Sequence, residues 1–439
     1  METVLNIKVS SSQTQPSGSS KLVEHFFRHE YGKVVAHLTR QFGADLIENI
    51  EDAVQESLYK AMQTWPYVGP PDRPTAWILR VARNKLLDQL RRNKNYAEKK
   101  EDILSDLQTR EAEVDVSIEN ELKDDLLKMM FACCHPTISP ESQIILTLKI
   151  LCGFSKVEIA RALLKKEDAI AKAYTRARAK LRDNHDAFIV PLGKDLNDRL
   201  DIILKIIYLL FNEGYNSSSG EKLIRHDLGA EAIRLAGLIL ENNLLTKPKV
   251  HALMSLMCFH ASRFDARIGN NGELLTLENQ DRTKWHQELI NKGLYHLGRS
   301  TEWGGISDYH IQATIASCHA QAKNYEDTDW EQILGLYDLQ LRVNPSAIVA
   351  LNRVVAFAKV NGVNDALIEL DKIESSGVLN DYYLFYAVKG DFLIQVGKNE
   401  EAVYNLSKAA ELTQNEAEKE YLLTKAQKLV NNKKGDLPR

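Results

Sequence analysis

The sequence predicts an all-α protein, and three observations support this prediction. Apolar residues recur every three to four positions in one segment after another, which is the spacing of a buried helix face. The C-terminal half shows no alternation of apolar and polar residues with a period of two, the pattern of a half-buried strand. Glycine and proline are few, at 22 and 11 of 439 residues.

Composition indicates a soluble globular chain of two to four domains, with 44% hydrophobic and 26% charged residues. The formal net charge of -4 conceals two oppositely charged segments. Residues 161–182 hold eight Lys or Arg against two acids, whereas 98–125 hold eleven acids against four bases. Basic helices on both sides of an acidic spacer are therefore expected.

The number of cysteines and the hydropathy of the sequence indicate the cellular compartment of the protein. Five cysteines, an odd and sparse number, favour reduced thiols in the cytoplasm over a disulfide framework. No uninterrupted apolar run of about 18 residues is present, so we expect no membrane span. Residues 1–20 are rich in Ser and Gln and predict a disordered tail.

A helical pattern covers 22–42, and Asp45 opens a second helix that we expect to end before Trp65-Pro66. The apolar positions of the second helix are Ile47, Ile50, Val54, Leu58 and Met62. Its polar face consists of Glu48, Glu51, Asp52, Gln55 and Glu56. Such a face is either simply solvated or a docking surface for a basic partner helix.

A loop is predicted over 66–74, followed by a two-faced helix over 73–92. The apolar face of this helix is Leu79, Ala82, Leu86 and Leu90. The other face mixes an aromatic ring, cations and an amide, namely Trp77, Arg80, Asn84, Asp88 and Arg91. These residue types stack on bases and bind base edges or phosphates. Taken alone, the pattern leaves open a nucleic-acid surface or a core Trp beside a solvated basic face.

Residues 93–125 predict a flexible acidic linker with some helix, and three more helical segments follow. The segments are 126–134, a helix that Ser139-Pro140 starts and Gly153 ends, and a short helix capped by Ser155 with Glu158. A longer basic helix then begins near Lys166 and continues to Arg182. Two short helices joined by a tight turn, the second basic, predict a helix-turn-helix.

Beyond Pro191 the pattern stays helical. The expected helices are 198–210, 227–241, 248–263, 281–297 and 307–321. A repeat of about 35 residues relates GVNDA at 362–366 to GKNEEA at 397–402, and Asn344-Pro345 ends a preceding helix. This period is that of tetratricopeptide helix pairs, so a repeat array is expected from about residue 330.

Three features of the sequence could bind a metal or ligand or catalyse a reaction, but each also has a purely structural interpretation. Cys133-Cys134-His135 could bind a metal, but adjacent cysteines on a helix diverge, which favours buried thiols. The Gly/Ser-rich stretch 211–221 could hold a phosphate or another ligand, although an ordinary loop or domain contact is favoured. Glu278, Asp281 and histidines 251, 260, 286 and 310 form no nucleophile-base set. We therefore expect no catalytic residues, no metal and no cofactor.

Three segments resemble a known family in the right order. The sequence AWILRVARNKLLDQLRR resembles the promoter −10 reading region of a bacterial sigma-70 factor, and DAVQESLYKAMQTWP before it resembles that family's polymerase-binding helix. SKVEIARALLKKEDAIAKAYTRARAKLR resembles its −35 helix-turn-helix. Because no third region intervenes, the layout resembles the extracytoplasmic-function (ECF) subfamily. The stretches CCHPTISPE, YLLFNEGYNSSSGE and ENQDRTKW resemble the subgroup with a C-terminal tetratricopeptide-like extension.

The resemblance implies roles for individual residues. Asp52, Gln55 and Glu56 would bind polymerase. The −10 set would be Trp77, Arg80, Asn84, Lys85, Asp88, Arg91 and Arg92. The −35 set would be Lys165, Lys166, Lys172, Thr175, Arg176 and Arg178. Ala169, Ala171 and Ala173 depart from the family, whose members often carry Thr, Lys and Arg there, so the contacts with base edges at these positions must differ or be fewer.

These observations predict a cytoplasmic transcription initiation factor, not an enzyme, that binds core RNA polymerase and promoter DNA. The expected domains are sigma region 2 at 21–95, the linker at 96–124, sigma region 4 at 125–190 and a regulatory extension at 191–439. The extension is a candidate for a peptide or protein partner. Two alternatives stay open: a ligand- or peptide-binding sensor whose basic helices only tether it to DNA, and an enzyme housed in 200–330.

Overall fold

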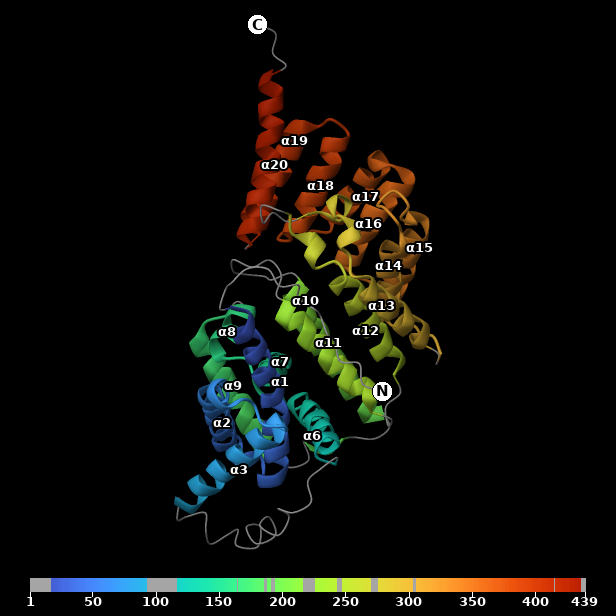
Figure 1. The fold of residues 1–439 in the computed structure, drawn as a ribbon. Coiled ribbons are helices and arrows are strands. Elements are labelled where there is room, and N and C mark those ends of the chain that lie inside the picture. The colour runs from blue at the N-terminus through green and yellow to red at the C-terminus, as the bar shows by residue number, and fades with distance from the viewer. Residues whose placement is uncertain are drawn as a thin grey trace. The chain divides into compact units, whose positions relative to one another are not determined.

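The computed structural model is helical throughout the residues it describes, and no strand occurs among them (Figure 1). Those residues are 17–92, 117–163, 165–184, 188–190, 194–215, 226–242, 247–269, 275–302, 305–413 and 415–435. The all-α prediction is confirmed. Two compact units are present, one of residues 1–156 with 171–192 and the other of 157–170 with 193–439. Most of the expected tail at 1–20 and of the expected linker at 93–125 lies outside the described residues. Residues 17–20, however, begin the helix Ser17–Phe42, and 117–125 belong to the helix Ser117–Cys133.

The described residues of the N-terminal part form several helices, besides a short 3-10 turn at Ala44–Leu46. They are α1 (Ser17–Phe42), α2 (Ile47–Val68), α3 (Pro74–Arg92), α6 (Ser117–Cys133), α7 (Pro140–Leu146), a π-helical turn (Thr147–Leu151), α8 (Lys156–Ala162) and α9 (Glu167–Asp183). Helix α1 packs against α2, α3, α6 and the π-helical turn. Its Gly32 allows this close approach, because a Cβ there would lie 2.3 Å from the carbonyl oxygen of Leu151.

A buried carboxylate fixes α6 on α1. Asp125 Oδ2 lies 2.8 Å from His37 Nδ1, and Arg40 Nε donates to Asp125 Oδ1 at 2.6 Å. Gln41 Nε2 lies 2.8 Å from the other ring nitrogen of His37. A buried carboxylate is stable only with such partners, so this network specifies how the two helices pair.

Helix α2 is longer than predicted, since it continues through Trp65-Pro66 to Val68. Proline has no N–H and crowds the preceding turn, so a proline normally ends a helix or lies near its end. Here only two residues follow Pro66 before Gly69, which has a φ of 78°. Trp65 packs edge-on against Trp77 of α3 with ring centroids 5.5 Å apart, and this tertiary contact holds the last turn.

The C-terminal part is a succession of packed helices. They are α10 (Lys194–Tyr215), α11 (His226–Glu241), α12 (Pro248–Ala261), α13 (Gln287–Ser300), α14 (Asp308–Gln321), α15 (Trp330–Val343), α16 (Ala347–Asn361), α17 (Val363–Ser375), α18 (Tyr383–Gln395), α19 (Asn399–Leu412) and α20 (Glu416–Gly435). Two expectations were wrong at their boundaries. Residues 211–215 belong to α10 instead of a loop, and 281–286 form a 3-10 turn and extended residues before α13.

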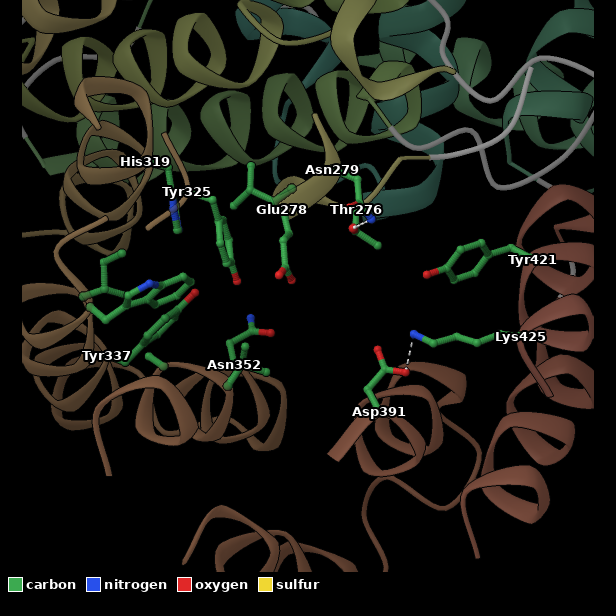
Figure 2. Close-up of a pocket in the computed structure, with 15 residues that line it drawn as sticks. Thr276, Glu278, Asn279, His319, Tyr325, Tyr337, Asn352, Asp391, Tyr421 and Lys425 are labelled. Atoms are coloured by element: carbon green, nitrogen blue, oxygen red, sulfur yellow. Dashed lines mark hydrogen bonds and ion pairs between the residues drawn. The ribbon is translucent and has the colours of Figure 1, made fainter. Parts of the chain in front are cut away.

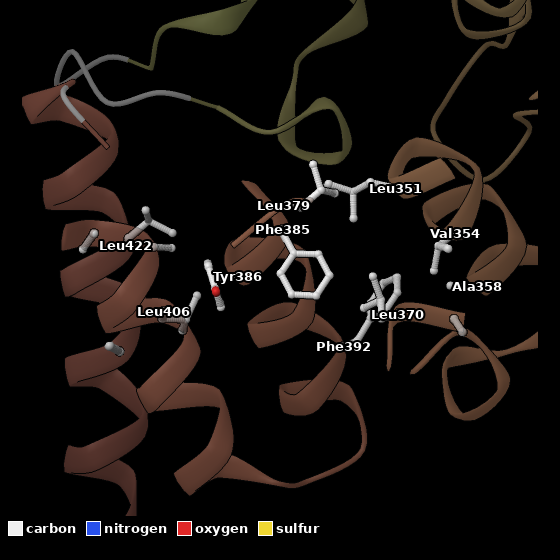
Figure 3. Close-up of a cluster of buried hydrophobic side chains, with 14 residues drawn as sticks. Leu351, Val354, Ala358, Leu370, Leu379, Phe385, Tyr386, Phe392, Leu406 and Leu422 are labelled. Atoms are coloured by element: carbon white, nitrogen blue, oxygen red, sulfur yellow. The ribbon is translucent and has the colours of Figure 1, made fainter. Parts of the chain in front are cut away.

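The repeat seen in the sequence coincides with the turns of two helix pairs. Gly362 separates α16 from α17 and Gly397 precedes α19, with φ of 96° and 77°, a conformation that favours glycine. Figure 3 shows the core of this part, in which Leu351, Leu370 and Phe392 face Phe385, Leu406 and Leu422. Gly390 lets α18 approach α19, because a Cβ there would lie 2.9 Å from Leu406 Cγ. That these helix pairs are tetratricopeptide repeats stays a prediction.

Candidate nucleic-acid interface

Helix α3 has the two faces that its sequence predicts. Leu79, Ala82 and Leu86 are buried, together with Ile78, which the prediction missed. Leu90 is only half-buried. On the other side Arg80, Asn84, Asp88, Arg91 and Arg92 are exposed. The cations of this face are therefore accessible to a phosphate backbone, and the amide of Asn84 is accessible to a base edge.

Trp77 and Lys85 are less free than the other members of the −10 set. Trp77 is half-buried in the edge-on pair with Trp65. Lys85 Nζ donates to Glu56 Oε1 of α2 at 2.5 Å. Ion pairs as exposed as this one contribute little to stability, so DNA can displace Glu56 from Lys85 at small cost.

The exposed face of α2 carries the predicted docking residues. Asp52, Gln55 and Glu56 are all exposed, at positions i, i+3 and i+4 of one helix. Tyr59 and Met62 continue this face, with 60% and 55% of their surfaces exposed. Met62 was expected in the apolar face, and that assignment was wrong. The sequence could have placed both residues on this face, because 59 and 62 continue the spacing of 52, 55 and 56.

Glu51 was expected on the same acidic face but is buried, with 5% of its surface exposed. Tyr31 donates to its Oε1 at 2.8 Å and Tyr174 donates to its Oε2 at 2.5 Å. Burial, followed by the charge of Glu51, raises the pKa of both tyrosines well above the usual value. Both phenols therefore stay protonated as donors, and the carboxylate joins α1, α2 and α9.

Helix α9 exposes most of the predicted −35 set. Lys165 and Lys166 before it and Lys172, Thr175 and Arg176 within it are exposed. Arg178 is directed elsewhere, since its Nη2 donates to Glu48 Oε2 of α2 at 2.8 Å. Ala173 is buried, so its departure from the family pattern removes no contact with DNA.

A comparison with protein families matches residues 26–96 to sigma-70 region 2, which spans most of α1 and all of α2 and α3. The docking residues and the exposed face of α3 all lie within this match. The chain therefore contains a domain that is similar to sigma-70 region 2. Sigma-70 proteins are transcription factors rather than enzymes, and they work with core RNA polymerase and promoter DNA.

Two other comparisons match parts of the chain outside region 2. Residues 199–301 match a family of unknown function, DUF6596. The chain is 36% identical over 374 residues to the uncharacterized protein R00370 of Rhizobium meliloti strain 1021, which covers 85% of this chain and 88% of that protein. It therefore belongs to one family with that rhizobial protein. No solved structure matches.

The part of the chain that matches the family of unknown function contains the stretch 211–221. Its first five residues are helical, and Tyr215 packs under two guanidinium groups, Arg267 at 3.8 Å and Arg263 at 5.5 Å from the ring centroid. Residues 216–221, where a ligand loop was considered, lie outside the described residues.

A cavity of about 420 Å³ lies among the later helices (Figure 2). Tyr325 and Tyr337 lie on one side of the cavity, and Asn352 and Glu278 point into the middle. Trp330 also lines the cavity and packs edge-on against Tyr325, with ring centroids 5.6 Å apart. At the other end Lys425 pairs with Asp391 at 2.6 Å, beside Tyr421. This volume and mixture of apolar and polar groups suit a small molecule.

His319 also lines the cavity. Burial and the nearby charges of Arg263 and Arg282 lower the pKa of His319 to about 4, so the imidazole is neutral at pH 7. Within the described part of the chain its Nδ1 has no hydrogen-bond partner. A neutral imidazole can accept or donate one hydrogen bond, so His319 is a candidate contact for a polar ligand.

The other cysteines and histidines that were considered for a chemical role are buried or make structural contacts. Cys133 and Cys134 are buried, and burial raises the pKa of the Cys133 thiol. His310 completes a capping box with Ser307, and His286 lies 2.7 Å from Asp265. Among the residues with described positions, no three His, Cys, Asp or Glu side chains could together hold a metal ion, and no helix is both long and apolar enough to span a bilayer.

Proposed function

We propose that this chain is a sigma factor of the ECF type, which brings core RNA polymerase to promoters in the cytoplasm. Helix α2 would dock on polymerase, α3 would read the −10 element and α9, in a helix-turn-helix with α8, would read the −35 element. The observation that carries this proposal is the arrangement of α2 and α3. Inside the matched region 2, one helix exposes Asp52, Gln55 and Glu56 and the next exposes Arg80 and Asn84.

Replacing Asp52, Gln55 and Glu56 together with alanine should weaken binding to core polymerase at least about tenfold, because interface residues that matter each cost more than about 1 kcal/mol on truncation. These side chains are exposed, so the fold should keep its stability. Co-purification and fluorescence anisotropy with labelled protein measure the loss.

The matched control is Glu331→Ala with Glu411→Ala, which removes the same charge from exposed positions on α15 and α19. If the control weakens polymerase binding as much as the triple variant, α2 is not the docking helix.

We also propose that the C-terminal extension regulates the sigma factor and that its helix pairs form a tetratricopeptide-like array for a peptide or protein partner. The cavity of Figure 2 favours a second candidate function, in which the extension senses a ligand. In both cases binding to the extension would control transcription at the promoters that α3 and α9 read.

Filling the cavity should change regulation without changing the fold. Asn352→Leu introduces an apolar side chain into the middle of the cavity, whereas Asn361→Leu alters an exposed position at the end of the same helix α16. In cells, Asn352→Leu should change transcript levels from dependent promoters at least about twofold at equal protein abundance. Equal transcript levels for Asn352→Leu and wild type would count against ligand sensing at this cavity.

A further inference from the structure

Helix α9 carries one carboxylate in the middle of its basic exposed face. The buried positions of the helix are Ile170, Ala173, Tyr174, Ala177 and Leu181. At 100° per residue, the opposite side is centred on Asp168, Lys172 and Thr175, with Lys165 and Arg176 beside them. Asp168 therefore lies on the same exposed face as the predicted −35 set.

Asp168 makes no side-chain contact that would hold it in place among the residues that the structure describes. Its side chain is exposed, and among the described residues it has no ion pair and no hydrogen-bond partner. A carboxylate on a DNA-facing surface is repelled by the phosphates, so it weakens non-specific binding. In contact with DNA, an acid at this position is favourable when it accepts a hydrogen bond from a base.

The major groove restricts which base that can be. The N4 amino group of cytosine is a donor that Asp and Glu accept from, whereas guanine presents only acceptors there and thymine an acceptor and a methyl group. Adenine has a donor at N6 but an acceptor at the adjacent N7, which repels a carboxylate and suits an amide side chain. Recognition helices contact base edges with their N-terminal residues, and Asp168 is the second residue of α9.

We propose that Asp168 is a specificity residue that accepts a hydrogen bond from the N4 amino group of a cytosine in the −35 element. This inference rests on the proposed function, because it assigns the base read by the proposed −35 helix. Arg176 lies about 12 Å further along the helix axis and serves the phosphates. The alanines at 169 and 171 leave the first turn with few other base contacts, so the carboxylate of Asp168 has a large share in the choice of sequence.

The competing explanation is that Asp168 only stabilises the helix. Carboxylates in a first turn interact favourably with the helix dipole, and Glu167 and Asp168 both lie there. Glu167 is also exposed, but it lies about 100° round the helix from Asp168, away from Lys172 and Thr175. Glu167→Gln is therefore a matched control that removes the same charge from the same turn without touching the proposed reading face.

The test is promoter selection by the full-length chain bound to core polymerase, using a DNA library randomised over the −35 element. Wild type should select a cytosine at one position. Asp168→Asn should move the preference at that position from cytosine to adenine, by at least about fivefold, and Asp168→Ala should lose it. Glu167→Gln should select the same sequence as wild type.

Two results would overturn the proposal. If Asp168→Asn and Asp168→Ala select the wild-type sequence at every position, Asp168 reads no base, although the chain is still a selective sigma factor. If wild type itself selects no −35 sequence while bound to polymerase, the assignment of α9 fails as well. Helix content by circular dichroism and unchanged polymerase affinity show that the variants are folded.

Discussion

Replacing Arg80 and Asn84 with alanine is expected to reduce promoter-specific initiation at least about tenfold while polymerase binding stays unchanged. Good base or phosphate contacts are worth about 1–3 kcal/mol each, and this variant removes two. Both side chains are exposed on α3, and among the described residues neither takes part in an ion pair, so the substitution removes no contact that holds the fold. Run-off transcription measures initiation, and anisotropy with labelled protein measures polymerase affinity.

The control for this prediction is Arg342→Ala with Gln395→Ala, which removes the same chemical groups from exposed positions of the extension. Initiation by the control should equal that of wild type. An equal loss in both variants, or a parallel loss of polymerase binding, would contradict the assignment of α3 to the −10 element.

Glu51→Ala is expected to lower the free energy of unfolding of the N-terminal unit by about 2–4 kcal/mol, because it leaves two buried tyrosine hydroxyls without an acceptor. Tyr31 and Tyr174 both donate to this carboxylate, which is 5% exposed. Urea unfolding followed by circular dichroism measures the change.

Glu48→Ala is the matched control on the same helix. It breaks the pair with Arg178, but Glu48 is largely exposed, so the cost should stay below about 1 kcal/mol. Equal destabilisation by the two variants would show that Glu51 does not join the helices as described.

The contact between α9 and α2 also has a consequence for promoter binding. The −10 and −35 elements are about 25 base pairs apart, which is roughly 85 Å along the DNA axis. In the described unit Arg178 lies 2.8 Å from Glu48, beside the docking face. Because α2 also packs against α3, this contact keeps α9 and α3 within one small unit. If the two helices read the two elements as proposed, we expect α9 to leave α2. The polymerase binding that we propose at α2 would be a suitable trigger, since Asp52, Gln55 and Glu56 lie close to Glu48 on the same helix.

Local patterns in the sequence predicted the starts of some helices well. Helix α3 was expected at 73–92 and α9 from Lys166, and each begins within one residue of that position. The exposed faces of both helices followed from the spacing of their apolar positions. Arg178 could not be placed, because its partner Glu48 lies 130 residues away in the chain.

The errors arose from long-range contacts. Glu51 looks like its acidic neighbours in the sequence, and only the approach of Tyr31 and Tyr174 buries it. The end of α2 depends on Trp65 meeting Trp77. The cavity of the extension collects side chains from Thr276 to Lys425, which no local pattern connects.

Transcription from fragmented genomic DNA tests the central claim most directly. Core polymerase alone and core polymerase with the purified full-length chain are given the same fragments, and the 5′ ends of the transcripts are sequenced. We expect new start sites that appear only with the protein and share −10 and −35 elements, and that disappear with the Arg80→Ala, Asn84→Ala variant. If the protein binds polymerase yet yields no new start site, the chain is not a promoter-specific sigma factor.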